Sequence, residues 1–400
     1  MVPAAQTLQA MKGMKILRSG RNRRKWIYVL LLMGLLGLSG CGSPSSASVE
    51  MSSQTELVKT GSMELQYAEN FTVDYYEDGY KMLTTLPDSQ RYLLVPEGQP
   101  VPQGLDEDVS ILQEPLQNIY LVASGVMDMF ASLDAVDQIR FSGQKQENWY
   151  IQTAKDAMAA GDMIYAGKYS KPDYELLVSE GCDLAIENRM ITHSPEVVEM
   201  LQSFDIPVMI EYSSYEQHPL GKVEWVKFFG ALTGKEAEAE EAFAEQTEIL
   251  EEVESGEKTG KTIAFFYVTS NGLIQVRQST DYIPKLIELA GGRYIFENLE
   301  DSGSGRSTLN MQVEDFYAGA KDADILIYNS SIDGGVTTVD ELIGKCNILK
   351  DFKAVQEGQV YCTTNDMYQQ SMAVGYLLQD MHTVLTDDDT VKLRYLFLLQ

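Results

Sequence analysis

The stretch from Pro219 to Ser255 constrains the fold most, because strand–helix alternations flank it on both sides. It begins with an apolar run at helical spacing, which ends at Thr233-Gly234. Lys235 to Glu254 then contains no Gly or Pro and consists almost entirely of residues that helices tolerate or favour. At 1.5 Å per residue, this second helix would span roughly 30 Å. Composition alone fits a surface helix with a solvated acidic face, whereas its position between two α/β segments favours a connecting strut.

A chain of 400 residues exceeds what one hydrophobic core usually holds, and its hydrophobic content of 44% is ample for burial. Strands alternate with helices on both sides of the strut, which is typical of mainly parallel sheets covered by helices. We therefore expect an α/β protein with two Rossmann-like lobes joined by a single long helix. The expected segments are a signal peptide at 1–40, a flexible tether at 41–62, an N-terminal α/β lobe with a β-rich extension at 63–218, a linker helix region at 219–255 and a C-terminal α/β lobe at 256–400.

Hydrophobic runs and turn residues predict the elements of each lobe. In the first lobe we expect short strands at 63–95, further strands at 119–124, 163–166, 182–186 and 206–210, and helices at 125–133, 172–179 and 195–204. In the second lobe we expect strands at 261–269, 293–296, 323–328 and 358–362, a hairpin partner at 273–277, and helices at 282–290, 313–320, 339–344 and 368–385. The apolar tail after Asp387-Asp388-Asp389 is expected to be an edge strand or a docking segment.

The N-terminus has the features of a targeting segment. A basic region from Arg18 to Lys25 leads into an apolar run from Ile27 to Leu38, which is too short for a comfortable membrane span. The run ends in Leu38-Ser39-Gly40-Cys41, which resembles a bacterial lipobox, so we expect lipid on Cys41 and a protein held on the extracytoplasmic face of the cell membrane. A single signal anchor is the alternative, and the start codon among Met1, Met11 and Met14 stays open.

Charge is distributed unevenly along the chain. Seven basic residues precede Cys41, and without them 24 basic residues face 59 acidic ones, a formal charge of −35. Such a surface repels nucleic acid and anionic lipid head groups. Nucleic-acid binding is therefore excluded.

Metal and enzyme signatures are missing from the sequence. Cys182, Cys346 and Cys362 form no metal-like spacing, and are either small buried hydrophobes or include one disulfide. Three histidines are too few for a multi-histidine metal site. The GxSxG, HExxH and P-loop motifs are absent, as is a GxGxxG after a strand. We expect no catalysis, no cofactor and no metal of the protein's own.

Candidate ligand-binding residues follow the strands, because ligands of open α/β sheets bind beyond the carboxyl ends of strands. Tyrosines offer a large apolar face with a polar tip, and cations can meet anionic groups of a ligand. For any single residue, a capped or solvated loop position is the alternative. The candidates are Tyr165, Lys168, Arg189, Tyr215, His218, Arg277, Tyr328, Asn329, Tyr368 and Gln369.

A family resemblance emerges from motifs in both lobes, over roughly residues 115 to 385. They include Cys182-Asp-Leu-Ala-Ile, Phe204-Asp-Ile-Pro-Val, Leu232-Thr-Gly-Lys-Glu-Ala, Pro284-Lys-Leu-Ile-Glu-Leu-Ala-Gly-Gly, Ala323-Asp-Ile-Leu-Ile and Ala354-Val-Gln-Glu-Gly-Gln-Val-Tyr. In order and spacing the chain resembles the substrate-binding lipoproteins of iron–siderophore and cobalamin ABC importers. The resemblance implies two lobes joined by a rigid helix, as in class III periplasmic binding proteins. It departs from the family in the β-rich segment 63–95 and in a long insert at 134–160.

The same resemblance implies a function and its partners. The chain would capture a ferric siderophore, haem or corrinoid and deliver it, as a monomer, to an ABC permease dimer with its cytoplasmic ATPase. Family members dock on the permease through one surface Glu per lobe, and Glu175 and Glu314 match those positions. Each also lies in a predicted first helical turn, where the helix dipole alone favours a carboxylate. The rival functions are a surface hydrolase or chelatase on the same lobes, and an adhesion or scaffold lipoprotein.

Overall fold

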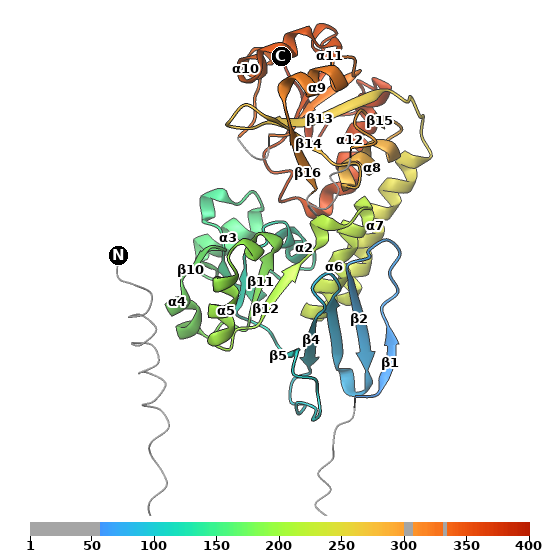
Figure 1. The fold of residues 1–400 in the computed structure, drawn as a ribbon. Coiled ribbons are helices and arrows are strands. Elements are labelled where there is room, and N and C mark those ends of the chain that lie inside the picture. The colour runs from blue at the N-terminus through green and yellow to red at the C-terminus, as the bar shows by residue number, and fades with distance from the viewer. Residues whose placement is uncertain (1–56, 300–306, 331–333) are drawn as a thin grey trace, which may run out of the picture. The chain divides into compact units, whose positions relative to one another are not determined.

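The computed structural model describes residues 57–299, 307–330 and 334–400 (Figure 1). It confirms the α/β fold class with mainly parallel sheets. The expected signal peptide, Cys41 and most of the expected tether lie outside the described residues. Within the described residues, no helix is long and apolar enough to cross a membrane. The domain boundaries stay predictions, while the elements inside them can be compared directly.

The first lobe contains a five-stranded parallel sheet in the order β12-β11-β6-β7-β8. Its strands are β6 (Ile119–Leu121), β7 (Ile139–Ser142), β8 (Ile164–Tyr165), β11 (Leu184–Asn188) and β12 (Val208–Glu211). Its helices are α2 (Val126–Ser132), α3 (Gln152–Ala160), α4 (Tyr174–Glu180) and α5 (Pro195–Ser203), and β9 (Gly167–Lys168) forms a small hairpin with β10 (Lys171–Pro172). The interpretation of 134–160 as an insert is wrong. This segment supplies β7 and α3, and β7 pairs with both β6 and β8.

The second lobe contains a mixed sheet in the order β16-β14-β13-β17-β18-β19, with β15 paired to β13. Its strands are β13 (Thr262–Val268), β14 (Ile274–Arg277), β15 (Arg293–Tyr294), β16 (Thr308–Met311), β17 (Ile325–Tyr328), β18 (Val360–Thr363) and β19 (Leu396–Leu398). The expected hairpin partner is confirmed as β14, and the apolar tail is an edge strand, β19, antiparallel to β18.

The helices of the second lobe are α8 (Tyr282–Leu289), α9 (Val313–Ala320), α10 (Val339–Lys345), α11 (Lys353–Gln356) and α12 (Val374–Thr386). The helix expected over 368–385 begins only at Val374. Residues 364–370 form turns, followed by a 3-10 turn at Ser371–Ala373. Gln369 therefore lies in a turn rather than in the helix, and its side chain reaches the first lobe.

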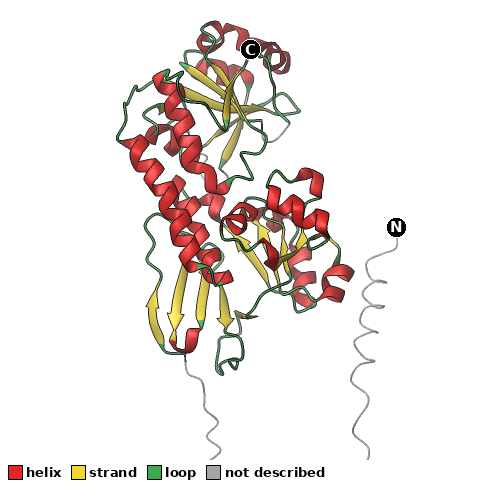
Figure 2. Cartoon of the chain, turned by 180° about the vertical axis from the view of Figure 1, so that it is seen from behind, coloured by secondary structure: helices red, strands yellow, loops and turns green. Residues whose placement is uncertain are grey.

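The β-rich segment forms a sheet of its own rather than an extension of the first-lobe sheet. Its strands are β1 (Lys59–Ser62), β2 (Phe71–Tyr76), β3 (Lys81–Thr85), β4 (Gln90–Val95) and β5 (Val109–Gln113), in sequential order. It lies against the linker helices (Figure 2). The Phe71 ring packs edge-on against Trp225 at 4.9 Å and against Phe228 at 5.2 Å between ring centroids.

Two helices form the linker, α6 (Pro219–Thr233) and α7 (Glu236–Glu254). His218 caps α6 and Pro219 occupies its first turn, and Gly234, with φ of +72°, ends it in the left-handed conformation. Every residue from Pro219 to Leu232 is buried, because α6 contacts the N-terminal sheet, α2 of the first lobe and α8 and α12 of the second. The expected strut is α7, but the packed centre of the protein is α6.

Two buried carboxylates attach the N-terminal sheet to α6. Glu224 accepts the backbone N–H groups of Gln66, Tyr67 and Ala68 at 2.8 to 3.1 Å, and Lys227 lies 3.6 Å from its Oε1. Gly221 permits this approach, since a Cβ there would lie 2.9 Å from the carbonyl oxygen of Tyr67. The charge on Glu224 therefore replaces water as the partner of three main-chain donors.

Glu216 repeats this arrangement on the next two residues. It accepts the N–H groups of Glu69 and Asn70 at 2.9 and 3.0 Å, and the indole N–H of Trp225 at 2.8 Å. Five consecutive N–H groups of the connection between β1 and β2 thus end on two glutamates.

The first prediction concerns this attachment. Glu224→Ala should lower the free energy of unfolding by about 2 to 3 kcal/mol, because it leaves one buried and two partly buried N–H groups without their acceptor. Hydrogen exchange at residues 66–70 should rise in the same variant. Glu241→Ala, an exposed carboxylate on α7, is the control and should change stability by at most about 0.5 kcal/mol. Equal effects of the two substitutions would contradict the assignment.

Candidate functional site

The two lobes meet where loops follow β7 and β18. The side chain of Gln369 is fully buried there and joins both lobes. Its Oε1 accepts the N–H of Tyr150 at 2.8 Å, and its Nε2 donates to the carbonyl oxygen of Asn148 at 2.8 Å. We call residues 148–150 and 368–372, together with Asp128, the interlobe junction.

A second hydrogen bond crosses the junction from α2. The Asp128 carboxylate accepts the backbone N–H of Met372 at 2.7 Å. Burial raises the pKa of Asp128 to about 6, although the Met372 N–H and the nearby Lys222 ammonium oppose the rise. Hydrogen bonds between residues of the two lobes therefore hold the junction together.

Exposed aromatic and apolar side chains gather on the loops and strand ends at the carboxyl edges of the two sheets. Of the eleven large hydrophobic side chains that the described residues expose, five lie there, with exposed fractions between 38% and 49%. Four belong to the first lobe and one to the second. They are Tyr150, Tyr165, Met190, Tyr215 and Tyr368. Exposed rings at these positions suit ligand contact, because each keeps accessible apolar surface at the edge where a ligand would bind.

Cations lie over two of these rings. The guanidinium of Arg189 is 4.7 Å from the ring centroid of Tyr215, and the ammonium of Lys155 is 5.9 Å from that of Tyr150. Both distances are within the range of cation–π attraction. Positive charge is thus available beside aromatic surface, in a chain that is strongly acidic as a whole.

In the second lobe, Arg277 and Asn329 line one small hollow, together with Phe265, Tyr267 and Thr308. The guanidinium of Arg277 lies 3.4 Å from the carboxylate of Asp281. Burial raises the pKa of Asp281, although Arg277 opposes the rise. Arg277 is therefore partly neutralised before any ligand arrives.

Two of the predicted ligand residues have other surroundings. Tyr328 is fully buried, and its ring packs 5.6 Å from Phe266 in the second-lobe core, so it presents no surface at the junction. The Nδ1 atom of His218 accepts the Leu220 N–H at 3.2 Å, and its ring stacks on Tyr67 at 4.4 Å. Burial lowers the pKa of His218. Both residues were predicted because they lie at or after the end of a strand in the sequence. In the structure, the Tyr328 side chain packs into the core from its strand, and His218 caps α6.

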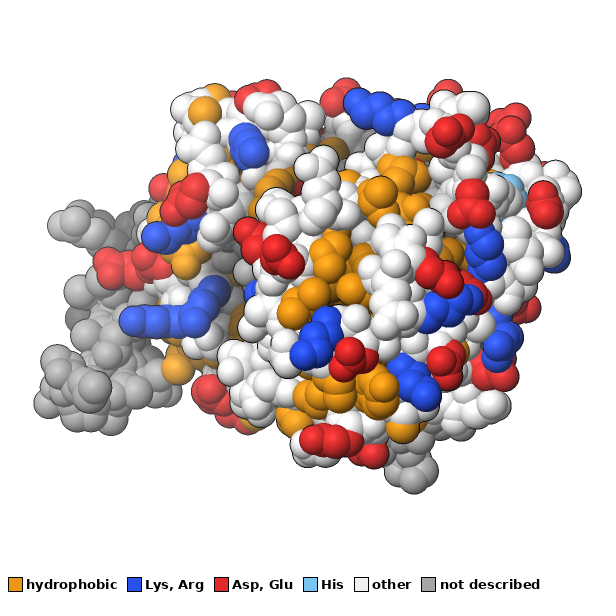
Figure 3. Space-filling view, turned by 90° about the horizontal axis from the view of Figure 1, so that it is seen from above, with side chains coloured by type: hydrophobic (Ala, Val, Ile, Leu, Met, Phe, Trp, Pro, Cys, Tyr) orange, Lys and Arg blue, Asp and Glu red, His pale blue; other side chains and the backbone are white. Residues whose placement is uncertain are grey.

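The remaining predicted residues lie on exposed elements. Tyr165 ends β8, Lys168 is exposed in β9, and Glu175 and Glu314 are exposed in the first turns of α4 and α9. Acidic and basic side chains are interspersed on the face of the second lobe seen from above (Figure 3). That face therefore has no large patch of a single charge.

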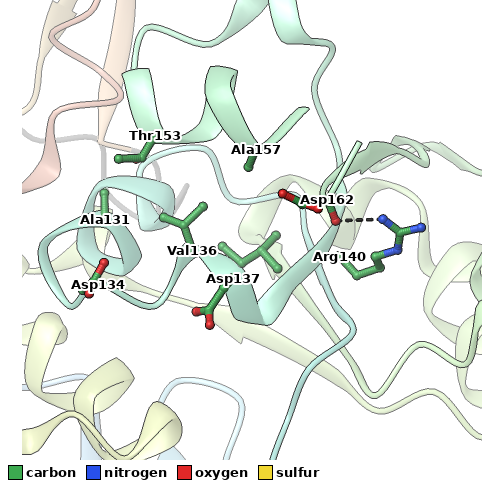
Figure 4. A pocket seen from close by; sticks show the side chains of 9 residues that line it. Ala131, Asp134, Val136, Asp137, Arg140, Thr153, Ala157 and Asp162 are labelled. Atoms are coloured by element: carbon green, nitrogen blue, oxygen red, sulfur yellow. Dashed lines mark hydrogen bonds between the residues drawn. The ribbon is translucent and has the colours of Figure 1, made fainter. Parts of the chain in front are cut away.

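One sizeable hollow of the described residues lies away from the junction. A hollow of about 650 Å³ lies beside the start of β7, between α2 and α3, and is lined by Asp134, Asp137, Arg140 and Asp162 among others (Figure 4). Arg140 donates to the carbonyl oxygens of Gly161 and Asp162 at 2.7 and 2.8 Å. The hollow is at the amino end of its strand, opposite the edge where open α/β sheets bind ligands. We therefore place the candidate site at the junction.

Sequence reasoning missed Tyr150, Asn148 and Asp128. Tyr150 follows β7, and the rule that selected residues after strands would have found it if 139–142 had been recognised as a strand. Asp128 left no comparable signal, because an acid in the first turn of a helix is common. Within the described residues, no group of three or more potential metal ligands occurs, and Cys182, Cys346 and Cys362 are free thiols.

Glu187 belongs to the run Glu187-Asn188-Arg189, which the sequence places at the end of a first-lobe strand. It is fully buried near the end of β11, and both carboxylate oxygens lack a hydrogen-bond partner. Burial raises its pKa to about 8. An acid in this state is neutral below that pH and costs stability once it ionises.

Comparison with known proteins extends these observations. The pattern of the periplasmic binding protein family matches residues 121–367. Two uncharacterized lipoproteins of Methanocaldococcus jannaschii are similar, one 24% identical with 90% of this chain and 92% of the relative covered, the other 22% identical with 89% and 94% covered.

Solved structures share the fold. A periplasmic haem-binding protein of Vibrio cholerae superposes with a TM-score of 0.53 at 14% identity, covering 67% of this chain and 98% of its own. A protein of an ABC-type Fe3+-hydroxamate transport system from Saccharomonospora viridis gives 0.53 at 16% identity, covering 68% and 93%. At these identities the likeness concerns the fold alone.

The second prediction concerns Glu187. Because its pKa is higher in the folded chain than in the unfolded one, wild-type stability should fall as the pH rises from about 4.5 to about 8. Glu187→Gln removes the ionisation, so the variant should match the wild type at pH 4. It should then exceed it by about 2 kcal/mol at pH 6, and by up to about 4 kcal/mol at pH 8. Chemical denaturation at the three pH values measures this. A difference that does not grow with pH would contradict it.

Proposed function

Because the chain belongs to the periplasmic binding protein family, whose pattern covers residues 121–367, we propose that it captures a chelated metal outside the cytoplasmic membrane and delivers it to an ABC permease. The proposed ligand is a ferric siderophore, haem or a corrinoid. Structural neighbours named for haem and Fe3+-hydroxamate transport support a ligand of this size and kind.

The observation that carries the proposal is the set of exposed side chains at the carboxyl edges of the sheets of the two lobes. Tyr150 and Tyr215 lie next to cations in the first lobe, and Tyr368 of the second lobe contacts the Tyr150 ring. A large ligand with apolar surface and anionic groups would be complementary to them. Arg189 and Lys168 are the cations that we propose for the ligand's anionic groups.

The proposal includes an anchor and no turnover chemistry. Cys41, if lipidated, would hold the protein at the membrane, in agreement with the lipoprotein names of the relatives. A hydrolase would need a nucleophile activated by a base, and the Nδ1 of His218 is already used in a helix cap. We therefore favour binding and delivery over catalysis.

The third prediction tests binding directly. The wild-type protein should bind at least one of haem, cyanocobalamin, a ferric tricatecholate and ferrioxamine with micromolar affinity or better. Trp149 lies beside Tyr150 in the junction loop, and its indole N–H donates to Ser142 at 3.0 Å, so its fluorescence should be quenched by a coloured ligand nearby. Trp149→Phe is the control, and should reduce the signal while preserving affinity in a calorimeter. Failure to bind any of the four ligands would overturn the proposed function.

The fourth prediction concerns delivery. Glu175 and Glu314 lie on separate lobes, and charges at an interface rim govern orientation and encounter more than ligand affinity. The double variant Glu175→Ala/Glu314→Ala should keep ligand affinity unchanged while uptake and binding to the permease fall.

Its control removes two exposed carboxylates elsewhere, Glu199→Ala/Asp322→Ala, and should transport normally. If Glu175 and Glu314 serve only the helix dipoles, their removal should cost a few tenths to about 1 kcal/mol of stability and leave uptake intact. Normal uptake in the double variant would therefore reject the docking role.

A further inference from the structure

The buried amide of Gln369 does more than join two loops, because it also holds the hydroxyl of Tyr368 and the backbone of Tyr150, two residues whose rings are exposed. Its Nε2 donates to the Tyr368 hydroxyl at 3.0 Å, in addition to its bonds with Asn148 and Tyr150. All the hydrogen bonds of this amide therefore end on the junction. An amide that is fully buried and has this many partners holds one orientation.

The two rings come from different lobes and meet at the junction surface. The ring centroids of Tyr150 and Tyr368 are 6.4 Å apart, with an angle of 86° between the ring planes. The edge of one ring therefore meets the face of the other, and both rings keep accessible surface, because Tyr150 is 44% exposed and Tyr368 is 38% exposed. The ammonium of Lys155, which makes no ion pair within the described residues, lies 5.9 Å from the Tyr150 ring.

The stability of the fold does not by itself explain why these two tyrosines are paired at the surface. Edge-to-face tyrosines gain most when they are buried, and these two leave much of their surface in water. Gln369 nevertheless bonds to the Tyr368 hydroxyl and to the Tyr150 backbone, and the two rings also contact each other. Rings that are exposed and already oriented lose little entropy when a flat partner stacks on them.

We propose that Tyr150 and Tyr368 form a two-lobe aromatic wall of two perpendicular rings, in which a flat ring system of the ligand stacks on the face of one ring and meets the edge of the other. Gln369 is the positioning residue, because it bonds to the Tyr368 hydroxyl and to the Tyr150 backbone. The inference rests on the proposed function and narrows the ligand to chelates that carry aromatic or macrocyclic rings. Open-chain hydroxamate chelates, which have no ring face to stack, would gain nothing from the wall.

The test compares ring-bearing with ring-free ligands. Haem and a ferric tricatecholate carry rings, and ferrioxamine does not. Tyr150→Leu and Tyr368→Leu should each weaken binding of a ring-bearing ligand by about three- to tenfold, and the double variant by more. If the wild type binds ferrioxamine, the affinity of the tyrosine variants for ferrioxamine should stay within about twofold of the wild-type value. Tyr376→Leu, which removes a tyrosine bonded to Glu245 outside the junction, is the control and should change neither.

The positioning role has its own readout. Gln369→Glu keeps the acceptor for the Tyr150 N–H and loses the two donated bonds, so it should reduce the preference for ring-bearing ligands. Tyr368→Phe keeps the ring and loses only the hydroxyl, and should have a smaller effect than Tyr368→Leu. A merely structural role would lower the melting temperature and leave the ratio of the two affinities unchanged. The tyrosine variants, whose side chains are exposed, keep the test valid if Gln369→Glu fails to fold.

The outcomes separate this inference from the proposed function. If the wild type binds no ligand in the panel, the proposed function fails and the inference with it. Wild-type binding of ferrioxamine alone would overturn the aromatic wall and leave the function standing. The wall is equally overturned if the double tyrosine variant binds ring-bearing ligands normally, or if it loses ring-bearing and ring-free ligands to the same extent.

Discussion

The structure depends on the burial of α6 from all sides. A helix that is buried on every side must find partners in every direction, and here these are the N-terminal sheet, both lobes and α7. The two glutamates that accept five consecutive N–H groups make this possible. Without Glu216 and Glu224, the segment at 66–70 would bring unsatisfied donors against an apolar helix. The hydrogen bonds of Glu216 and Glu224 thus allow the N-terminal sheet to cover the part of α6 that the two lobes leave uncovered.

The lobes are joined in two ways that differ in strength. The packed helices α6 and α7 provide a large apolar connection, in which α12 of the second lobe also contacts α7. The junction of Gln369 with Asn148 and Tyr150 provides a small polar one, at the edge where a ligand would enter. A rigid linker with a hydrogen-bonded rim favours a site formed in advance over one assembled by wide lobe closure. This agrees with the rigid helix that the family resemblance implies.

Buried carboxylates are unusually numerous around α6 and the first-lobe sheet, and they fall into two groups. Glu224 and Glu216 have several donors each, and their burial is compensated. Glu187 has none, so its charged form is opposed by burial alone. The difference shows that burial by itself says little about the role of an acid. Its donors decide whether it stabilises the fold or weakens it.

The sequence by itself determined the α/β class, most elements, the α7 strut and the family, because hydrophobic periodicity and turn residues are local signals. It placed Tyr368 and Gln369 after a strand, and the position of Tyr165 follows from the same rule. It missed β7, which lies in the segment 134–160 that was interpreted as an insert, and therefore missed Tyr150 as well. The His218 cap on α6 is a local contact with Leu220, whereas only the tertiary structure decided that Tyr328 packs inward and that Gln369 bonds to the opposite lobe. These outcomes depend on contacts between residues as many as 221 positions apart, which no local pattern encodes.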